Sequence, residues 1–168
     1  YINYIYRVEV TTKGEKFSFI VKQGREQSKE LPMKLPVSRN KLEYKSIKLR
    51  QAIVPQYLPE LYYIDEVNGI FIMEDCSELK ILRYQLSRGN ILEGVEANIA
   101  SYLARSHFFS SEIYLTKETF RSLDRVFVNN EMRRVMEDGI FIPEYNPLEA
   151  KEHQIPYSDI YLLSRNIW

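Results

Sequence analysis

The sequence has no excess of either charge and almost no cysteine. Its 23 Lys and Arg residues balance 23 Asp and Glu residues, so the formal net charge is zero. This balance excludes a strongly basic nucleic-acid clamp and a polybasic membrane anchor. The single cysteine, Cys76, excludes an internal disulfide framework and is typical of a reducing compartment such as the cytoplasm.

Long apolar runs and signal-peptide patterns are missing as well. No run approaches the roughly 18 apolar residues of a membrane span, so we expect a cytoplasmic protein that binds neither membranes nor nucleic acid. The chain has 168 residues, of which 45% are hydrophobic and 27% charged, which is typical of a globular protein. Because it starts at Tyr1 without an initiator Met and ends at Trp168 without a polar tail, we expect a piece of a longer protein.

The first part of the chain is typical of strands. Two pairs of runs rich in β-branched and aromatic residues predict hairpins: 2–10 with 17–22, and 61–64 with 70–73 around Asn68–Gly69. Between the pairs, Ser38 is a candidate N-cap for a helix over 39–52, which follows a polar connector from Gly24 to Val37.

After Cys76 the pattern becomes helical. Leucines at 79, 82 and 86, apolar residues from 95 to 103, and Phe120, Leu123 and Phe127 predict three helices. The tail from Glu137 onward has three prolines and no period, which indicates irregular structure. We therefore predict an α+β fold in which a five-strand antiparallel sheet with one inserted helix precedes a helical lobe.

Lys22 and Glu43 form the first candidate site. A lysine near the end of a strand and a glutamate on a helix over that strand can form an ion pair that aims the ammonium at phosphate oxygens. From spacing alone, a solvated strand end and an ordinary helix charge are the more frequent outcome.

The apolar strand Ile70–Met73 opening into Glu74-Asp75-Cys76 forms the second candidate site. An adenine ring could lie on the apolar floor while backbone groups of the corner read its edge. Taken alone, this pattern is more often that of an ordinary buried strand ending in a turn.

Several separated blocks resemble the N-terminal half of methylthioribose kinases, in the aminoglycoside-phosphotransferase and choline-kinase-like branch of the protein-kinase-like fold. These blocks are Asn3–Val8, Ile20–Gln23, Arg39 with Glu43, Leu58–Tyr62, Met73–Asp75, Leu79–Arg83, Ile99–Arg105, Phe108–Ser111 and Phe127–Phe141. The resemblance covers roughly residues 1–145. It implies a kinase-like N-terminal lobe over 1–73, a hinge over 74–78, and the beginning of a helical C-terminal lobe over 79–168.

The resemblance also implies residue roles in ATP binding. Asn3 is similar to the nucleotide-loop asparagine, Lys22 to the lysine that binds the ATP phosphates, and Glu43 to the glutamate that orients this lysine. Met73 would border the back of the adenine pocket. The hinge would be formed by Glu74, Asp75 and Cys76, where Cys76 replaces the usual leucine of the family.

The family's His-Gly-Asp catalytic loop and Asp-x-Glu metal motif are not recognisable. His107 is followed by Phe108 and His153 by Gln154, so neither histidine begins such a loop. We read His107 as a packed or capping side chain. The chain would thus contribute no catalytic or metal-binding residue, although the reaction needs Mg²⁺.

The resemblance implies transfer of the ATP γ-phosphoryl group to the 1-hydroxyl of 5-methylthioribose, in methionine salvage, by a homodimer. Two alternatives remain open at this point. One is a related kinase for another alcohol, such as choline or an aminoglycoside. The other is a non-catalytic remnant of the kinase fold that acts as a binding module.

Overall fold

The computed structural model describes residues 2–27 and 34–141 of the chain. The chain divides into two compact units. The larger unit comprises Asn3–Gly24 and Val37–Val128, and the smaller comprises Tyr1–Ile2, Arg25–Pro36 and Asn129–Trp168. All the residues of the two candidate sites lie in the larger unit.

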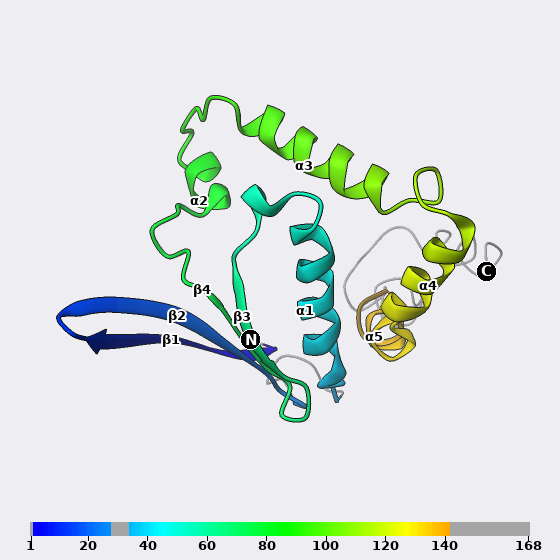
Figure 1. Ribbon diagram of the computed structural model, residues 1–168, viewed down its shortest axis with the longest axis horizontal. Helices are drawn as coiled ribbons and strands as arrows, with labels where there is room; N and C mark the ends of the chain where they lie inside the picture. Colours follow the sequence, from blue (N-terminus) through cyan, green and yellow to red (C-terminus); the bar gives the residue numbers. More distant parts are fainter. Residues whose placement is uncertain (1, 28–33, 142–168) are drawn as a thin grey trace, which may run out of the picture. The chain divides into compact units, whose positions relative to one another are not determined.

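The larger unit is built on an antiparallel sheet with the strand order β1-β2-β4-β3 (Figure 1). The strands are β1 (Asn3–Thr12), β2 (Glu15–Gly24), β3 (Leu61–Asp65) and β4 (Ile70–Glu74). Both predicted hairpins are confirmed, because β1 pairs with β2 and β3 pairs with β4. With the helices that follow, the fold is α+β, as predicted.

The expected count of five strands is wrong for the described residues, whose sheet has four strands. Only four strand-like runs lie between Asn3 and Glu74. The chain between the two hairpins instead forms helix α1 (Ser38–Gln51) and the 3₁₀ helix η1 (Pro55–Tyr57). Strands β1 and β3 are therefore the edges of this sheet.

The hairpin of β1 and β2 is longer than the sheet to which it belongs. The two strands pair along all ten residues of each, whereas β2 pairs with β4 only over Phe19–Gln23. Beyond Phe19 the hairpin has no third strand beside it among the described residues, and it projects from the sheet (Figure 1). Its turn at Lys13–Gly14 has positive φ at both residues, as tight two-residue hairpin turns require.

Helix α1 packs against β2, β3 and β4. Its Tyr44 ring meets the Phe71 ring of β4 edge-on at 6.0 Å, and Phe71 is fully buried. The prediction that Ser38 caps this helix is wrong. Ser38 is already its first residue, and Val37 before it has helical φ and ψ and forms no side-chain cap.

Asn40 joins α1 to the turn between β3 and β4. Its side chain is 1% exposed, and its Nδ2 donates to the carbonyl oxygen of Gly69 at 2.9 Å. The backbone N–H of Gly24 donates to the same oxygen at 3.0 Å. One carbonyl therefore connects the end of β2, the first turn of α1 and the β3–β4 turn.

The rest of the larger unit is helical. Helices α2 (Leu82–Ser87), α3 (Val95–Phe109) and α4 (Lys117–Phe127) confirm the three predicted helices, although α2 begins three residues after Leu79. Helix α4 has a side-chain cap, because the Thr116 hydroxyl accepts from the Thr119 N–H.

In the smaller unit, helix α5 (Asn130–Met136) leads into a π-helical turn, η2 (Glu137–Phe141). The Asn129 side chain caps α5 by accepting from the Met132 N–H at 3.1 Å. The prediction of irregular structure from Glu137 onward is thus wrong for 137–141. Residues 142–168, with His153, and 28–33 of the connector lie outside the described residues.

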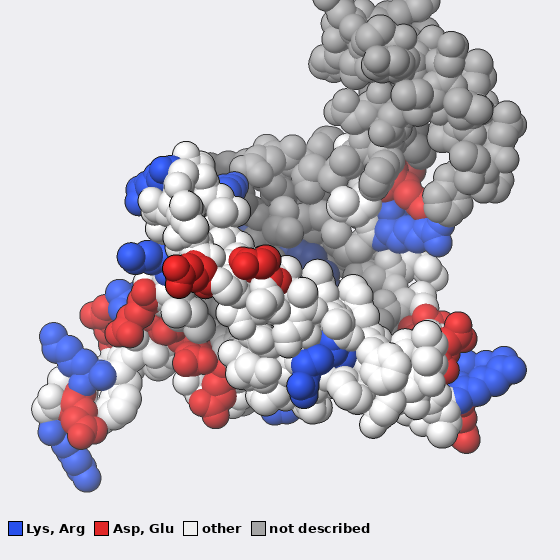
Figure 2. Space-filling model, turned by 90° about the horizontal axis from the view of Figure 1, so that it is seen from above, with Lys and Arg blue, Asp and Glu red and all other residues white. Residues whose placement is uncertain are grey.

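Charged side chains of both signs are intermixed on the face seen in Figure 2, with uncharged surface between them. This distribution agrees with the zero net charge of the sequence. In residues 2–27 and 34–141, no helix combines the length and apolarity needed to cross a bilayer.

Candidate functional site

Lys22 and Glu43 form an ion pair, with 2.5 Å between Nζ and Oε1. Lys22 lies near the end of β2, and Glu43 faces it from the second turn of α1. The Lys22 side chain is 16% exposed and that of Glu43 39%, and the Lys22 ammonium also lies 5.8 Å from the centre of the Phe71 ring. The ion pair suggested by the sequence is therefore present in the structure, while its role in binding phosphate stays a prediction.

Asn3 lies close to this pair on the same face of the sheet. In the β1–β2 register Asn3 is opposite Gly24 and Ile5 is opposite Lys22, so Asn3 and Lys22 are diagonal neighbours. The Asn3 side-chain oxygen accepts a hydrogen bond from Arg39 Nη2 at 2.7 Å. Arg39 is 8% exposed, and burial lowers its pKa while the charge of Glu43 acts in the opposite direction.

Two cations and one carboxylate make up this cluster. Lys22 and Arg39 are cationic, and the Glu43 carboxylate acts on both. A lysine ammonium held by a carboxylate acts as an oriented point charge toward phosphate oxygens. The phosphate-binding role that we propose for Lys22 rests on this chemistry.

Met73 and Glu74 stand where β4 ends. Met73 is opposite Ile20 of β2, on the face that also bears Lys22. Glu74 is tied to Glu60 before β3: its N–H donates to the Glu60 carbonyl at 2.8 Å, and its Oε2 accepts from the Glu60 N–H at 3.0 Å. The Glu74 side chain thus connects strand ends.

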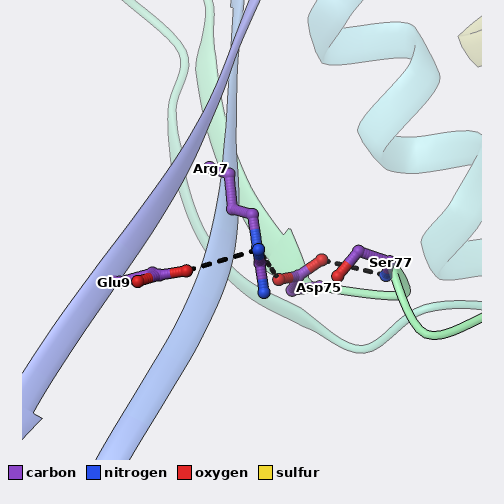
Figure 3. A network of polar contacts seen from close by, with 4 residues as sticks. All are labelled: Arg7, Glu9, Asp75 and Ser77. Atoms are coloured by element: carbon purple, nitrogen blue, oxygen red, sulfur yellow. Dashed lines mark hydrogen bonds and ion pairs between the residues drawn. The ribbon is translucent and has the colours of Figure 1, made fainter.

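The Asp75 carboxylate is the centre of a polar network (Figure 3). Its Oδ2 accepts from Arg7 Nε at 2.6 Å, and its Oδ1 accepts from the Ser77 backbone N–H at 2.9 Å. Arg7 also contacts Glu9 at 3.3 Å. The Asp75 side chain is 3% exposed, so its carboxylate faces protein groups rather than water. Hydrogen bonds from Arg7 first, then from Ser18 and Ser77, hold the pKa of Asp75 well below its ordinary value.

Acid is expected to weaken this network. The pKa of folded Asp75 lies below its ordinary value of 3.8, so the carboxylate stabilises the fold above that value and this stabilisation is lost as the pH falls below it. Asp75→Asn removes this contribution. The difference in melting temperature between the two proteins, measured from neutral pH to about pH 2, should therefore shrink with acid, and a constant difference would contradict the assignment.

Cys76 comes next in the chain after Asp75, and the residue as a whole is exposed. Partial burial raises the pKa of its thiol, and the charges of Glu74 and Asp75 raise it further. The thiol is therefore protonated at neutral pH, which makes it a weak nucleophile. This supports a thiol that lines a surface over one that reacts.

The structure thus groups the predicted residues in two places. Asn3, Lys22 and Glu43 lie together at one end of α1. Glu74, Asp75 and Cys76 lie at the end of β4, in residues 74–78, which we call the 74–78 corner. Sequence reasoning missed the contacts of Arg39 with Asn3 and of Arg7 with Asp75, which join residues 36 and 68 positions apart. No local pattern indicates either contact.

A cavity of about 370 Å³ lies between α1, α3 and α4. Leu49, Ile53 and Phe127 contribute apolar lining, and His107 and Asp124 are among its polar residues. In the described part of the chain, no group of three or more His, Cys, Asp or Glu side chains is arranged to hold a metal ion.

No protein-family model matches the chain. Individual proteins do match it. A methylthioribose kinase of Bacillus cereus (strain AH187) is 29% identical over 169 aligned positions, which cover 99% of this chain and 41% of that protein. A methylthioribose kinase of Geobacillus sp. (strain WCH70) is 31% identical over 144 positions, which cover 83% of this chain and 35% of that protein. One of Bacillus mycoides (strain KBAB4) is 28% identical over 99% of this chain and 41% of its own length.

The chain spans about two fifths of the length of the curated relatives that it matches. This extent is consistent with the resemblance to an N-terminal half. Over nearly its whole length, the chain is homologous to part of the methylthioribose kinases.

Proposed function

We propose that this chain is the ATP-binding part of a cytoplasmic kinase with the protein-kinase-like fold. Its substrate would be 5-methylthioribose, phosphorylated on the 1-hydroxyl in methionine salvage. The homologues support a kinase of this kind. Residues 1–73 would form the N-terminal lobe, 74–78 the hinge and 79–168 the start of the C-terminal lobe.

The Lys22–Glu43 ion pair carries this proposal. Phosphoryl transfer depends on positioning and on compensation of phosphate charge, and a lysine on a strand held by a helix glutamate supplies both. At 2.5 Å the pair fixes the ammonium, and Asn3 and Arg39 beside it complete a polar cluster. Lys22 would bind phosphate oxygens, and Glu43 would hold Lys22 in place.

Adenine would lie against the 74–78 corner. The Glu74 and Asp75 carboxylates are engaged with Glu60 and Arg7, so the backbone of the corner is the part suited to read the base. Met73 would border the pocket from the face that bears Lys22.

ATP in such kinases is used with Mg²⁺, which compensates phosphate charge. The described residues contain no cluster fit to hold this metal, and we assign them no step that involves it. The catalytic base and the magnesium ligands would come from parts of the longer protein that these residues do not include.

Lys22→Ala is expected to weaken ATP binding roughly 10- to 100-fold, because a hydrogen bond between charged groups contributes about 1.5–3 kcal/mol. Isothermal titration calorimetry measures the affinity directly. Thermal unfolding gives a second readout, since ATP at 100 times its dissociation constant adds about 2.7 kcal/mol to the free energy of unfolding.

Lys41→Ala is the matched control. Lys41 lies on the same helix as Glu43 and forms an ion pair with Glu66 at the same 2.5 Å distance. Its loss should leave the ATP affinity unchanged. Equal ATP affinities of the two variants would refute the role of Lys22, and an unaltered chain that binds no ATP would refute the proposed function itself.

A further inference from the structure

The Asp75 network lies where the long hairpin leaves the sheet. The pairing of β2 with β4 ends at Phe19 and Glu74, so Asp75 is the first residue after the last paired position. On the other side of this point, β1 and β2 continue as a two-stranded ribbon that projects from the sheet (Figure 1). A contact at this point, where the β2–β4 pairing ends, can fix the direction of the ribbon relative to the sheet.

Arg7 links the two sides of this branch point. It lies on β1 opposite Ile20 of β2, and Ile20 is in turn opposite Met73 of β4. Its side chain reaches across β2 to Asp75, as Figure 3 shows. The Asp75 carboxylate therefore ties β1 of the hairpin to the end of β4.

The same carboxylate also shapes the 74–78 corner. Its Oδ1 accepts from the Ser77 N–H at 2.9 Å, which closes a turn of the backbone. The Leu79 N–H then donates to the Cys76 carbonyl at 3.0 Å and closes the next turn. With its side chain 3% exposed, Asp75 is tightly held, whereas Arg7 is 51% exposed and would be mobile without its partner.

We propose that Arg7 and Asp75 are positioning residues for adenine: their ion pair holds the backbone of the 74–78 corner in the conformation that reads the base. The inference rests on the proposed function. A backbone that is already ordered does not lose conformational freedom when the ligand binds, and pre-organisation of this kind raises affinity. Neither side chain needs to contact the nucleotide.

Adenosine and tripolyphosphate separate this role from a general effect on the fold. Adenosine carries the base without phosphates, and tripolyphosphate carries phosphates without the base. In Asp75→Asn, the affinity for adenosine and for ATP should fall roughly tenfold, as expected for the loss of a charged hydrogen bond. The affinity for tripolyphosphate should stay within about twofold, because the Lys22 cluster is untouched.

Arg7→Gln tests the same contact from its exposed end, where a loss of folding is not expected, and should reproduce this pattern. Arg7→Lys keeps the charge but not the Nε donor, and should restore part of the adenosine affinity. Arg133→Gln is the matched control: Arg133 donates its Nε to Glu137 at a similar 2.7 Å, is 59% exposed and has no place in the Asp75 network, so its loss should change neither affinity.

An adenosine affinity that is unchanged in both Asp75→Asn and Arg7→Gln would overturn the inference and leave the proposed function standing. An equal loss of adenosine and tripolyphosphate binding would also overturn it, because the effect would then be a general one. If the unaltered chain bound none of the three ligands, the proposed function would fail and the inference with it.

Discussion

Phe71→Ala should lower the free energy of unfolding by about 3–5 kcal/mol, the usual cost of truncating a buried aromatic side chain. Phe71 is fully buried in β4, between β2 and β3, and its ring packs against Tyr44 of α1. Small domains have total stabilities of about 5–15 kcal/mol, so this loss would be a large fraction of the whole. Urea unfolding followed by circular dichroism measures it.

Phe17→Ala provides the comparison. Phe17 is on β2, in the part of the hairpin that has no third strand beside it among the described residues, and is 50% exposed. Its truncation should cost less than about 1 kcal/mol, because little apolar surface is returned to water. If both variants lost the same stability, Phe71 would not be the centre of the contact between the sheet and α1.

Gly69→Ala is expected to destabilise the protein through two separate effects. Gly69 has φ of +61°, a conformation that costs other residues roughly 1–2 kcal/mol. An added Cβ would also overlap the Val37 side chain, and forced contacts of this kind cost about 1–3 kcal/mol. The sum should appear as a lower urea midpoint with an unchanged slope.

Gly14→Ala separates these two effects. Gly14 also has positive φ, at +88°, but an added Cβ there meets no atom within 4 Å. Only the conformational cost should remain in this variant. Val37→Ala combined with Gly69→Ala should recover the steric part, as a double-mutant cycle measures. Equal losses in Gly69→Ala and Gly14→Ala would show that the overlap with Val37 is relieved without cost.

Local chemistry made both hairpins predictable from the sequence. Asn68–Gly69 sits between two apolar runs, and Gly69 does adopt the positive φ that such a turn needs. The Lys22–Glu43 contact could be anticipated for a related reason. A strand and a helix were each recognisable, and packing of that helix against the sheet brings the two side chains together.

The strand order could not be predicted in this way. Alternation along a strand determines which side chains share a face, but it does not determine that β4 lies next to β2. The contact of Arg7 with Asp75 depends on that neighbour relation, because Arg7 reaches across β2 to the residue after β4. The predicted count of five strands is wrong for the described residues, in which four runs form the strands of the sheet.

The start of helix α2 differs from its predicted position because of local hydrogen bonds. The leucine spacing predicts a helix from Leu79, yet α2 begins at Leu82. The residues before Leu82 form turns instead. The Asp75 carboxylate accepts from the Ser77 N–H, and the Cys76 carbonyl accepts from the Leu79 N–H. The spacing of apolar residues cannot predict such a turn, because a single carboxylate side chain closes it.

The turn of the projecting hairpin lies far from the contact between Arg7 and Asp75, so a small change of strand direction at this contact would displace the turn by a larger distance. A strand rises about 3.3 Å per residue, so the five steps from Arg7 to Thr12 span about 17 Å. A rotation of the hairpin by about 10° at the contact would move the turn by about 3 Å. A substitution at this contact that leaves the sheet intact would therefore cause the largest displacement at Lys13 and Gly14, the residues of the turn.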